Sequence, residues 1–428
     1  MLICFGNKRI ERIGLNFHNF FKSISFEEMN KLRVLIISFF LVGCASEFSS
    51  VENPENDQIP VVQIQLNDDL GYVSKEEYSS GTIQIESANE NDRIGPSSVK
   101  LRGRGNTSWS FPKKPFQLKF NEPLEVLGMP YSKKWLLMAH YSDKSLLRTE
   151  LAFDLSRESR LNWTSGSRFV ELIINEEYLG LYQLVEKIES THNRLNSGQG
   201  FVLEVNRPNR QGPDDVVFKS NFHEYTVKDP EVVNGDFEFE LIKDYIITCE
   251  EVLFGPDFRD SILGYHSYID IYSFVDWYII HEITKNSESA WSSSCYLNYV
   301  PGEKLKMGPV WDFDLSLGNN YAARPTSGFV IKDAGWYSRL FQDSIFVECV
   351  KERFDYFYLQ KSEFIATIDQ HASDIDGAQQ RNFIKWPILG VWVWPNAVSF
   401  TEYEHEVSYL SDWFSDRMDW LDGAIENL

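Results

Sequence analysis

Two aspartates stand inside an otherwise apolar run, in the stretch GPVWDFDLSLGNN at 308–320. If residues 305–315 form a strand, Asp312 and Asp314 project from the same face, about 7 Å apart, because strand side chains alternate. Two carboxylates in this position repel each other unless a cation lies between or beside them. Hard oxygen ligands of this kind suit Mg²⁺ or Ca²⁺. The alternative is a solvent-facing strand end with two unpaired acids.

Cations gather around two glycines in the stretch LRGRGNTSWSFPKKPFQLKF at 101–120. Gly103 and Gly105 permit close backbone approach, and backbone N–H groups beside Arg or Lys satisfy phosphate oxygens. The cations are Arg102, Arg104, Lys113, Lys114 and Lys119. The stretch is neither a Walker A sequence nor the GxGxxG of a dinucleotide fold. A β-turn with ordinary surface cations is the alternative.

An amide and a third carboxylate precede the aspartates. A helix is expected to end near Lys285, which leaves Asn286 and Glu288 on a loop. There they could orient a hydroxyl nucleophile or complete a metal site.

A second helix is expected to begin in YSDKSLLR at 141–148, with Ser142 or Asp143 as its cap. Lys144 and Arg148 lie one turn apart on it, facing either a cleft or solvent.

Hydrolytic chemistry has little support. His281 is expected on a helix face, and no histidine is placed for a Ser/His/Asp arrangement. A metal-dependent hydrolase built on the same acids lacks an evident nucleophile or activating base.

The elements that must position these groups change character along the chain. Strand-like alternation runs from Val61 to about Lys187 and includes a hairpin whose turn is expected at 175–177. One helix, expected at 143–159, interrupts these strands. After Asn206 apolar residues recur at helical spacing, in the stretches 228–255, 267–286 and 407–425. The pattern predicts an α+β protein with a strand-rich lobe at 61–206, a helix-rich lobe carrying the acidic site at 207–428, and a cleft between them.

Charge and composition exclude some function classes. With 43% hydrophobic residues, the chain of 428 residues can bury a sizeable core. A formal charge of −22 argues against binding to a nucleic-acid backbone, which needs a basic face. It also disfavours a polybasic membrane anchor.

The N-terminal region carries a targeting signal. Residues 29–44, MNKLRVLIISFFLVGC, have two cations, a short apolar stretch and small residues before Cys44, as in a secretory signal peptide. The ending resembles a bacterial lipobox, in which the cysteine is lipidated. We therefore expect an exported protein anchored through Cys44 in the bacterial cell envelope, with an acidic linker at 45–60. Because the pattern starts at Met29, residues 1–28 are interpreted as an upstream extension of the reading frame.

Six stretches in the same order resemble the CotH family, the spore-coat-protein-H-like atypical protein kinases. They are RGRGNTSW, KKPFQLKF, WLLMAHYSDKSLLRTELAFDLSR, VELIINEEYLGLYQLVEKIE, SFVDWYIIHEITKN and MGPVWDFDLSLGN, over roughly residues 98–320.

The resemblance implies a kinase-like bilobal fold that binds ATP with Mg²⁺ and transfers the γ-phosphoryl group to Ser or Thr of an acceptor protein. It implies a catalytic role for Glu288 and Asp312, and metal ligation by Asp312, Asp314 and Asn286. The residues that it implies for nucleotide binding are Arg104, Asn106, Lys114, Lys119, Arg148 and Glu186.

One departure from the family bears on activity. Where many relatives read Lys-Asn-Val-Asp, the chain reads Lys285-Asn286-Ser287-Glu288, with glutamate in place of the aspartate. A carboxylate displaced by about 1 Å can cost about a hundredfold in rate. Two hypotheses therefore stand: a Mg²⁺-dependent protein kinase, and an anchored binding or scaffold lipoprotein that keeps the fold without turnover.

Overall fold

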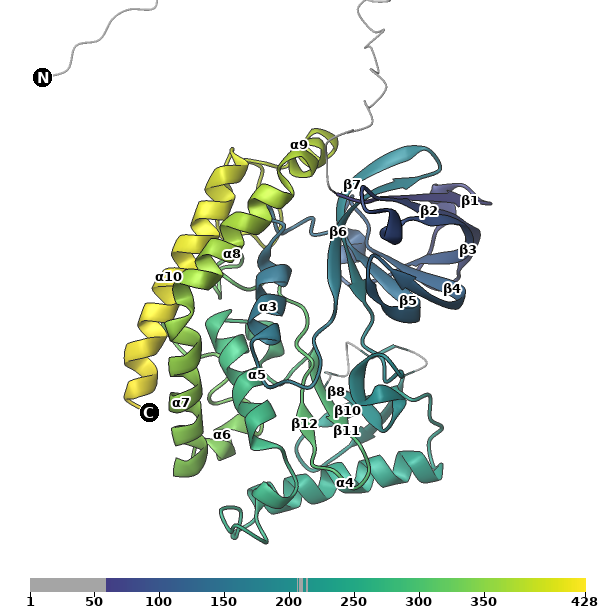
Figure 1. Ribbon diagram of the computed structural model, residues 1–428. Helices are drawn as coiled ribbons and strands as arrows, with labels where there is room; N and C mark the ends of the chain where they lie inside the picture. The colour runs from purple at the N-terminus through teal and green to yellow at the C-terminus, as the bar shows by residue number, and fades with distance from the viewer. Residues whose placement is uncertain (1–58, 206, 208–210, 213–214) are drawn as a thin grey trace, which may run out of the picture. The chain divides into compact units, whose positions relative to one another are not determined.

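The first seven strands close into a barrel in the computed structural model, which describes residues 59–205, 207, 211–212 and 215–428 (Figure 1). The strand order is β1-β2-β3-β4-β5-β7-β6, with β1 and β6 pairing in parallel and every other pair antiparallel. The strands are β1 (Val61–Leu66), β2 (Ser79–Glu86), β3 (Ile94–Gly103), β4 (Phe116–Val126), β5 (Met129–Met138), β6 (Ser167–Ile174) and β7 (Glu177–Glu186).

Alternating side chains fill the barrel. Val62, Ile64 and Leu66 of β1 point inward and are buried, while Gln65 is exposed, as a strand with one core face requires. The predicted hairpin is confirmed as β6 and β7. Its turn has two residues, Asn175 and Glu176, both with positive φ, the geometry that matches the twist of paired strands.

A second sheet of five strands follows the barrel along the chain. Its order is β12-β11-β8-β10-β9. The strands are β8 (Phe201–Val205), β9 (Val216–Lys219), β10 (Glu224–Asp229), β11 (Cys295–Tyr299) and β12 (Lys306–Met307). The expectation of helices directly after Asn206 was therefore wrong in part, because two short strands come before the first long helix.

The C-terminal region is mainly helical, as predicted (Figure 1). The helices are α3 (Arg148–Arg157), α4 (Phe237–Phe254), α5 (Ile271–Ile283), α6 (Tyr337–Leu340), α7 (Ser344–Leu359), α8 (Lys361–Asp374), α9 (Asp376–Lys385) and α10 (Tyr403–Glu426). A strand-rich N-terminal region and a helical C-terminal region are thus confirmed, and the bilobal kinase-like arrangement stays a prediction.

Helix α5 runs through the core of the helical region, and almost all of its residues are buried. It packs against α3, α7 and α10. An ion pair joins it to α10, where Arg417 donates to the Glu282 carboxylate at 2.9 Å, both side chains being fully buried. The apolar positions predicted for the last helix all face this core. The end of α5 is therefore held firmly where the chain turns toward Asn286.

The acidic stretch is not a strand, contrary to the expectation for 305–315. Strand β12 ends at Met307, and residues 308–319 form an irregular loop. Asp312 has φ +71°, a left-handed conformation that aspartate tolerates better than most residues. The loop is fixed to the end of α5, because Leu317 N–H donates to the Thr284 carbonyl at 2.8 Å. The directions of the Asp312 and Asp314 side chains are therefore set by the turns of this loop, and not by the alternation of side chains along a strand.

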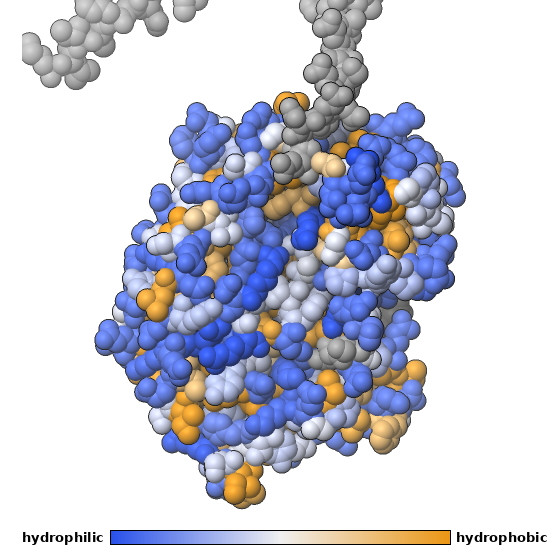
Figure 2. All heavy atoms as spheres, viewed as in Figure 1, coloured by the Kyte–Doolittle hydropathy of each residue, from blue (hydrophilic) through white to orange (hydrophobic). Residues whose placement is uncertain are grey.

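The described residues belong to one compact unit, and none of their helices is both long and apolar enough to cross a bilayer. On the face drawn in Figure 2, hydrophilic residues predominate and hydrophobic ones form small separate groups. The predictions for residues 1–28, for the signal peptide at 29–44 with Cys44, and for nearly all of the linker lie outside the described residues.

Candidate active site

Three carboxylates meet at one wall of a pocket. Glu288 comes from a short 3-10 helix, Ser287–Ser289, just after α5, and Asp312 and Asp314 come from the acidic loop. One carboxylate oxygen of each lies within 4.8 Å of those of the other two, and all three side chains are half-buried. The structure thus brings together three acids that the sequence singled out.

Burial raises the pKa of Asp314 well above its ordinary value, and the negative charges of Asp312, Glu288 and Asp143 add to the shift. A carboxyl group in this setting is stabilised by a proton or by a metal cation.

Asn286 stands directly behind the acidic loop. Its side-chain N–H group donates to the Asp312 carbonyl at 2.8 Å. Its side-chain oxygen is buried and has no hydrogen-bond partner among the described residues. A buried polar oxygen without a partner is costly, but Asn286 itself is not among the residues that line the pocket, so its contact with the Asp312 carbonyl gives it a role in holding the loop.

These donors fit a hard divalent cation. Carboxylate oxygens and an amide oxygen are the ligands that Mg²⁺ and Ca²⁺ take in proteins. Asp312, Asp314 and Glu288 would supply both the charge and the ligand oxygens. The set contains no sulfur or imidazole ligand, which zinc would favour.

A glycine turn lines the same pocket as the acids. It follows β3, and its residues Arg104 to Ser108 all belong to the lining. Gly105 has φ +86°, and a Cβ there would lie 2.1 Å from the Ser108 hydroxyl oxygen, so the turn tolerates no larger residue. Burial lowers the pKa of Arg104, and the charges of Asp312, Tyr296 and Asp314 oppose that shift. Arg104 is therefore a cation directed at the acids.

Four of the residues expected at a nucleotide lie outside the lining of this pocket. Lys114 donates to the Trp109 carbonyl at 2.6 Å, and Lys119 lies over the ring of Tyr78. Arg148 forms a buried ion pair with Asp143 and donates to the Leu317 carbonyl. Glu186 accepts hydrogen bonds from Arg194 and from the Gly166 N–H group.

Those contacts give one of the four, Arg148, a positioning role, because it holds the end of the acidic loop through Leu317. Asp143 accepts from the Arg148 N–H group at 3.0 Å, but the N-cap residue of α3 is Leu147, which makes no side-chain cap bond. The expectation that Ser142 or Asp143 caps this helix was therefore wrong, because the helix begins only at Arg148. Arg104 and Asn106 do line the pocket, and so does Lys113, the neighbour of Lys114.

Several lining residues were not foreseen from the sequence. They are His140, Glu204, Ser294, Tyr296 and Trp394, which come from the segment after β5, from β8 and β11, and from the segment before α10. Ser294 links two walls, since its hydroxyl donates to Asp312 at 3.0 Å and its N–H group donates to Glu204 at 3.1 Å. Only His140 stands in one of the quoted stretches, and no residue type or spacing singled out any of the five.

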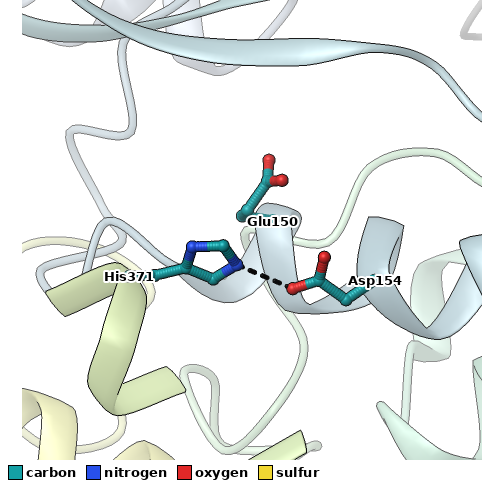
Figure 3. Close-up of side chains that lie close together, drawn as sticks. All are labelled: Glu150, Asp154 and His371. Atoms are coloured by element: carbon teal, nitrogen blue, oxygen red, sulfur yellow. Dashed lines mark hydrogen bonds and ion pairs between the residues drawn. The ribbon is translucent and has the colours of Figure 1, made fainter. Parts of the chain in front are cut away.

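A second cluster of possible ligands lies between α3 and α8 (Figure 3). His371 of α8 contacts Asp154 of α3 at 2.8 Å, and Glu150 lies one turn away on α3. The Glu150 carboxylate accepts from Arg157, Ser167 and Gln183. Because an arginine already supplies the positive charge and the Glu150 oxygens are hydrogen-bonded, this cluster joins two helices and is not a metal site.

A barrel, a helical region and a pocket whose lining combines three acids with an arginine-bearing glycine turn define a class of proteins suited to charged ligands. Comparison with known families then identifies the family. A model described as CotH kinase protein matches residues 101–421, and the chain belongs to that family. No curated protein matches the chain. Membership of the family indicates an atypical kinase-like function.

Proposed function

We propose that this protein is a Mg²⁺-dependent phosphotransferase that moves the γ-phosphoryl group of ATP to a Ser or Thr hydroxyl of a protein. The observation that carries the proposal is the pocket itself, whose lining combines the carboxylates of Glu288, Asp312 and Asp314 with the cation Arg104. Catalysis of phosphoryl transfer depends mainly on positioning the reactants and stabilising charge, and it needs little covalent chemistry from the protein.

The acids and the glycine turn that line the pocket have separate roles in this proposal. Asp312 and Asp314 would hold Mg²⁺, and Asn286 would position Asp312 through the hydrogen bond to its carbonyl. Bound there, the ion would neutralise charge on the phosphates of the nucleotide. Arg104 and the backbone N–H groups of the glycine turn would contact the phosphate oxygens. Glu288 would accept a hydrogen bond from the acceptor hydroxyl and fix its approach.

The test is a binding and turnover assay on residues 45–428. We expect ATP with Mg²⁺ to raise the melting temperature, and ATP with a chelator to have little effect. Asp312→Asn should abolish both the Mg²⁺-dependent shift and phosphate incorporation, because one ligand charge is lost.

Glu348→Gln is the matched control, since Glu348 lies on α7 outside the pocket lining. A wild-type protein that shows no shift at millimolar nucleotide contradicts the proposal. A shift without any phosphate incorporation favours the alternative of a binding or scaffold module.

The location of the protein is part of the proposal. Export and lipidation at Cys44 would place the domain in the cell envelope, where its acceptor protein must also pass or reside. The substrate would therefore be a protein that resides in the envelope or passes through it.

A further inference from the structure

A row of polar side chains crosses one face of the five-stranded sheet beside the acids. Thr226 of β10 and Tyr296 of β11 lie directly opposite Glu204 of β8, on either side of it. Directly paired residues of antiparallel strands share a face. Glu204 and Tyr296 both line the pocket, so this row forms a wall that the proposed function has not used.

Glu204 is a buried carboxylate at that wall. One of its oxygens accepts from the Ser294 N–H group at 3.1 Å. The other lies 3.5 Å from the Lys228 ammonium, which is also 3.3 Å from Asp215. Burial raises the pKa of Glu204, and Lys228 and the Ser294 N–H group oppose that shift. The carboxylate therefore retains capacity to accept a hydrogen bond from a ligand.

Thr226 adds an independent observation. Its side chain is fully buried, and its hydroxyl has no hydrogen-bond partner in the part of the chain that the structure describes. A buried hydroxyl left unpaired costs stability. It lies on the same face as Glu204, next to the pocket wall.

The chemistry of this wall excludes a phosphate as its ligand. Carboxylates and phosphates both only accept hydrogen bonds, and their charges repel. The part of a nucleotide that faces Glu204 must therefore donate hydrogen bonds and be uncharged. The hydroxyl groups of the sugar and the amino group of adenine both meet that requirement, and the link from Glu204 through Ser294 to Asp312 favours the sugar, because the sugar is the part next to the phosphates.

Ser294 fixes the distance between this wall and the acids. Because it donates to Glu204 through its N–H group and to Asp312 through its hydroxyl, both carboxylates belong to one hydrogen-bonded unit. A sugar at Glu204 would thus be held next to the phosphate-binding part of the pocket.

We propose that Glu204 recognises the ribose hydroxyls of the nucleotide and makes the site selective for ribonucleotides. This inference rests on the proposed function and deepens it. Glu204 is a specificity-determining residue, and Thr226 supports the same wall.

The experiment compares four probes by calorimetry in the presence of Mg²⁺: ATP, 2′-deoxy-ATP, 3′-deoxy-ATP and inorganic triphosphate. With the wild-type protein, ATP should bind at least about tenfold more tightly than the weaker deoxy analogue, as expected for loss of a hydrogen bond to a charged group. Glu204→Ala should bring ATP to the level of that analogue and leave inorganic triphosphate unchanged.

Two further variants keep the test decisive if Glu204→Ala does not fold. Glu204→Gln preserves the shape and should reduce the selectivity for ATP over the deoxy analogues. Glu224→Gln, on β10 but outside the pocket lining, should retain full selectivity.

The failures are distinguishable. Equal binding of ATP and both deoxy analogues by the wild-type protein overturns the role of Glu204 while leaving the phosphate site intact. Loss of Mg²⁺ binding without nucleotide in Glu204→Gln also overturns it, because Glu204 would then be a metal ligand. Absence of binding by all four probes overturns the proposed function itself.

Discussion

At the scale of single residues, Asp314 bears the largest electrostatic cost in the pocket. It is half-buried beside Asp312 and Glu288, and its pKa is raised by burial and by those charges. We expect Asp314→Asn to increase the free energy of unfolding by about 1 kcal/mol in chelator at neutral pH, since a repelled charge is removed.

With Mg²⁺ present, the wild-type protein should instead be more stable than Asp314→Asn, because only the wild type keeps all of the carboxylates that bind the ion. Melting temperatures of both proteins in chelator and in millimolar Mg²⁺ provide the measurement. A variant less stable than wild type in chelator would show that the three acids do not repel in the folded protein.

Glu288 is the residue at which the chain departs from many relatives. One of its carboxylate oxygens lies within 4.8 Å of those of the other two acids, so the longer side chain still joins the cluster. We expect Glu288→Asp to withdraw the carboxylate by about one methylene and lower kcat on the order of a hundredfold. KM for ATP should change far less. An equal or faster rate in initial-velocity assays would contradict this reading.

At the scale of elements, the pair of His371 and Asp154 joins α8 to α3, the helix whose first residue, Arg148, holds the acidic loop. Burial lowers the pKa of His371, but the hydrogen bond and charge of Asp154 outweigh it and the net shift is upward. A raised folded-state pKa stabilises the fold below the ordinary histidine pKa of about 6.5, and that stability is lost as the pH rises through the folded value.

His371→Gln should therefore lower the free energy of unfolding by up to about 1 kcal/mol at pH 5.5 and by less at pH 8.5. Urea unfolding at both pH values measures the difference. His405→Gln is the control, because His405 is exposed on α10. An equal loss at both pH values would mean that the imidazole acts by packing alone.

The elements differ in how well the sequence predicts them. Strand β1, the β6–β7 hairpin and α10 follow local periodicity, and the structure confirms them. The five-stranded sheet could not be predicted, because β8 pairs with β11, about ninety residues further on, and such long-range pairing leaves no local pattern. The acidic loop was misread as a strand, because its apolar residues are buried in an irregular backbone that turns at Asp312.

At the scale of the whole molecule, the pocket gathers residues from Arg104 to Trp394. The acids and the glycine turn were predicted, since their residue types and spacing are unusual in themselves. Glu204 and Ser294 were not predicted. A single glutamate in a strand and a serine in a run of serines are common in sequences, and only the fold brings these two residues into one hydrogen-bonded unit with Asp312. The second wall therefore depends on tertiary structure alone.

The last prediction concerns the attachment of the whole chain. If Cys44 is lipidated after removal of residues 29–43, the full-length protein should fractionate with membranes, and Cys44→Ser should release it. One acyl chain holds a protein only reversibly, so the intact mass of the mature chain should show at least two acyl chains on Cys44.

Cys349→Ser is the matched control, because Cys349 is a free, partly buried thiol on α7 and should leave fractionation unchanged. A wild-type mature chain that retains residues before Cys44, or that is soluble with an unmodified cysteine, would contradict the anchor. The binding and turnover assays use residues 45–428, which lack Cys44. Their results would remain valid in that case, so the site and the anchor are tested separately.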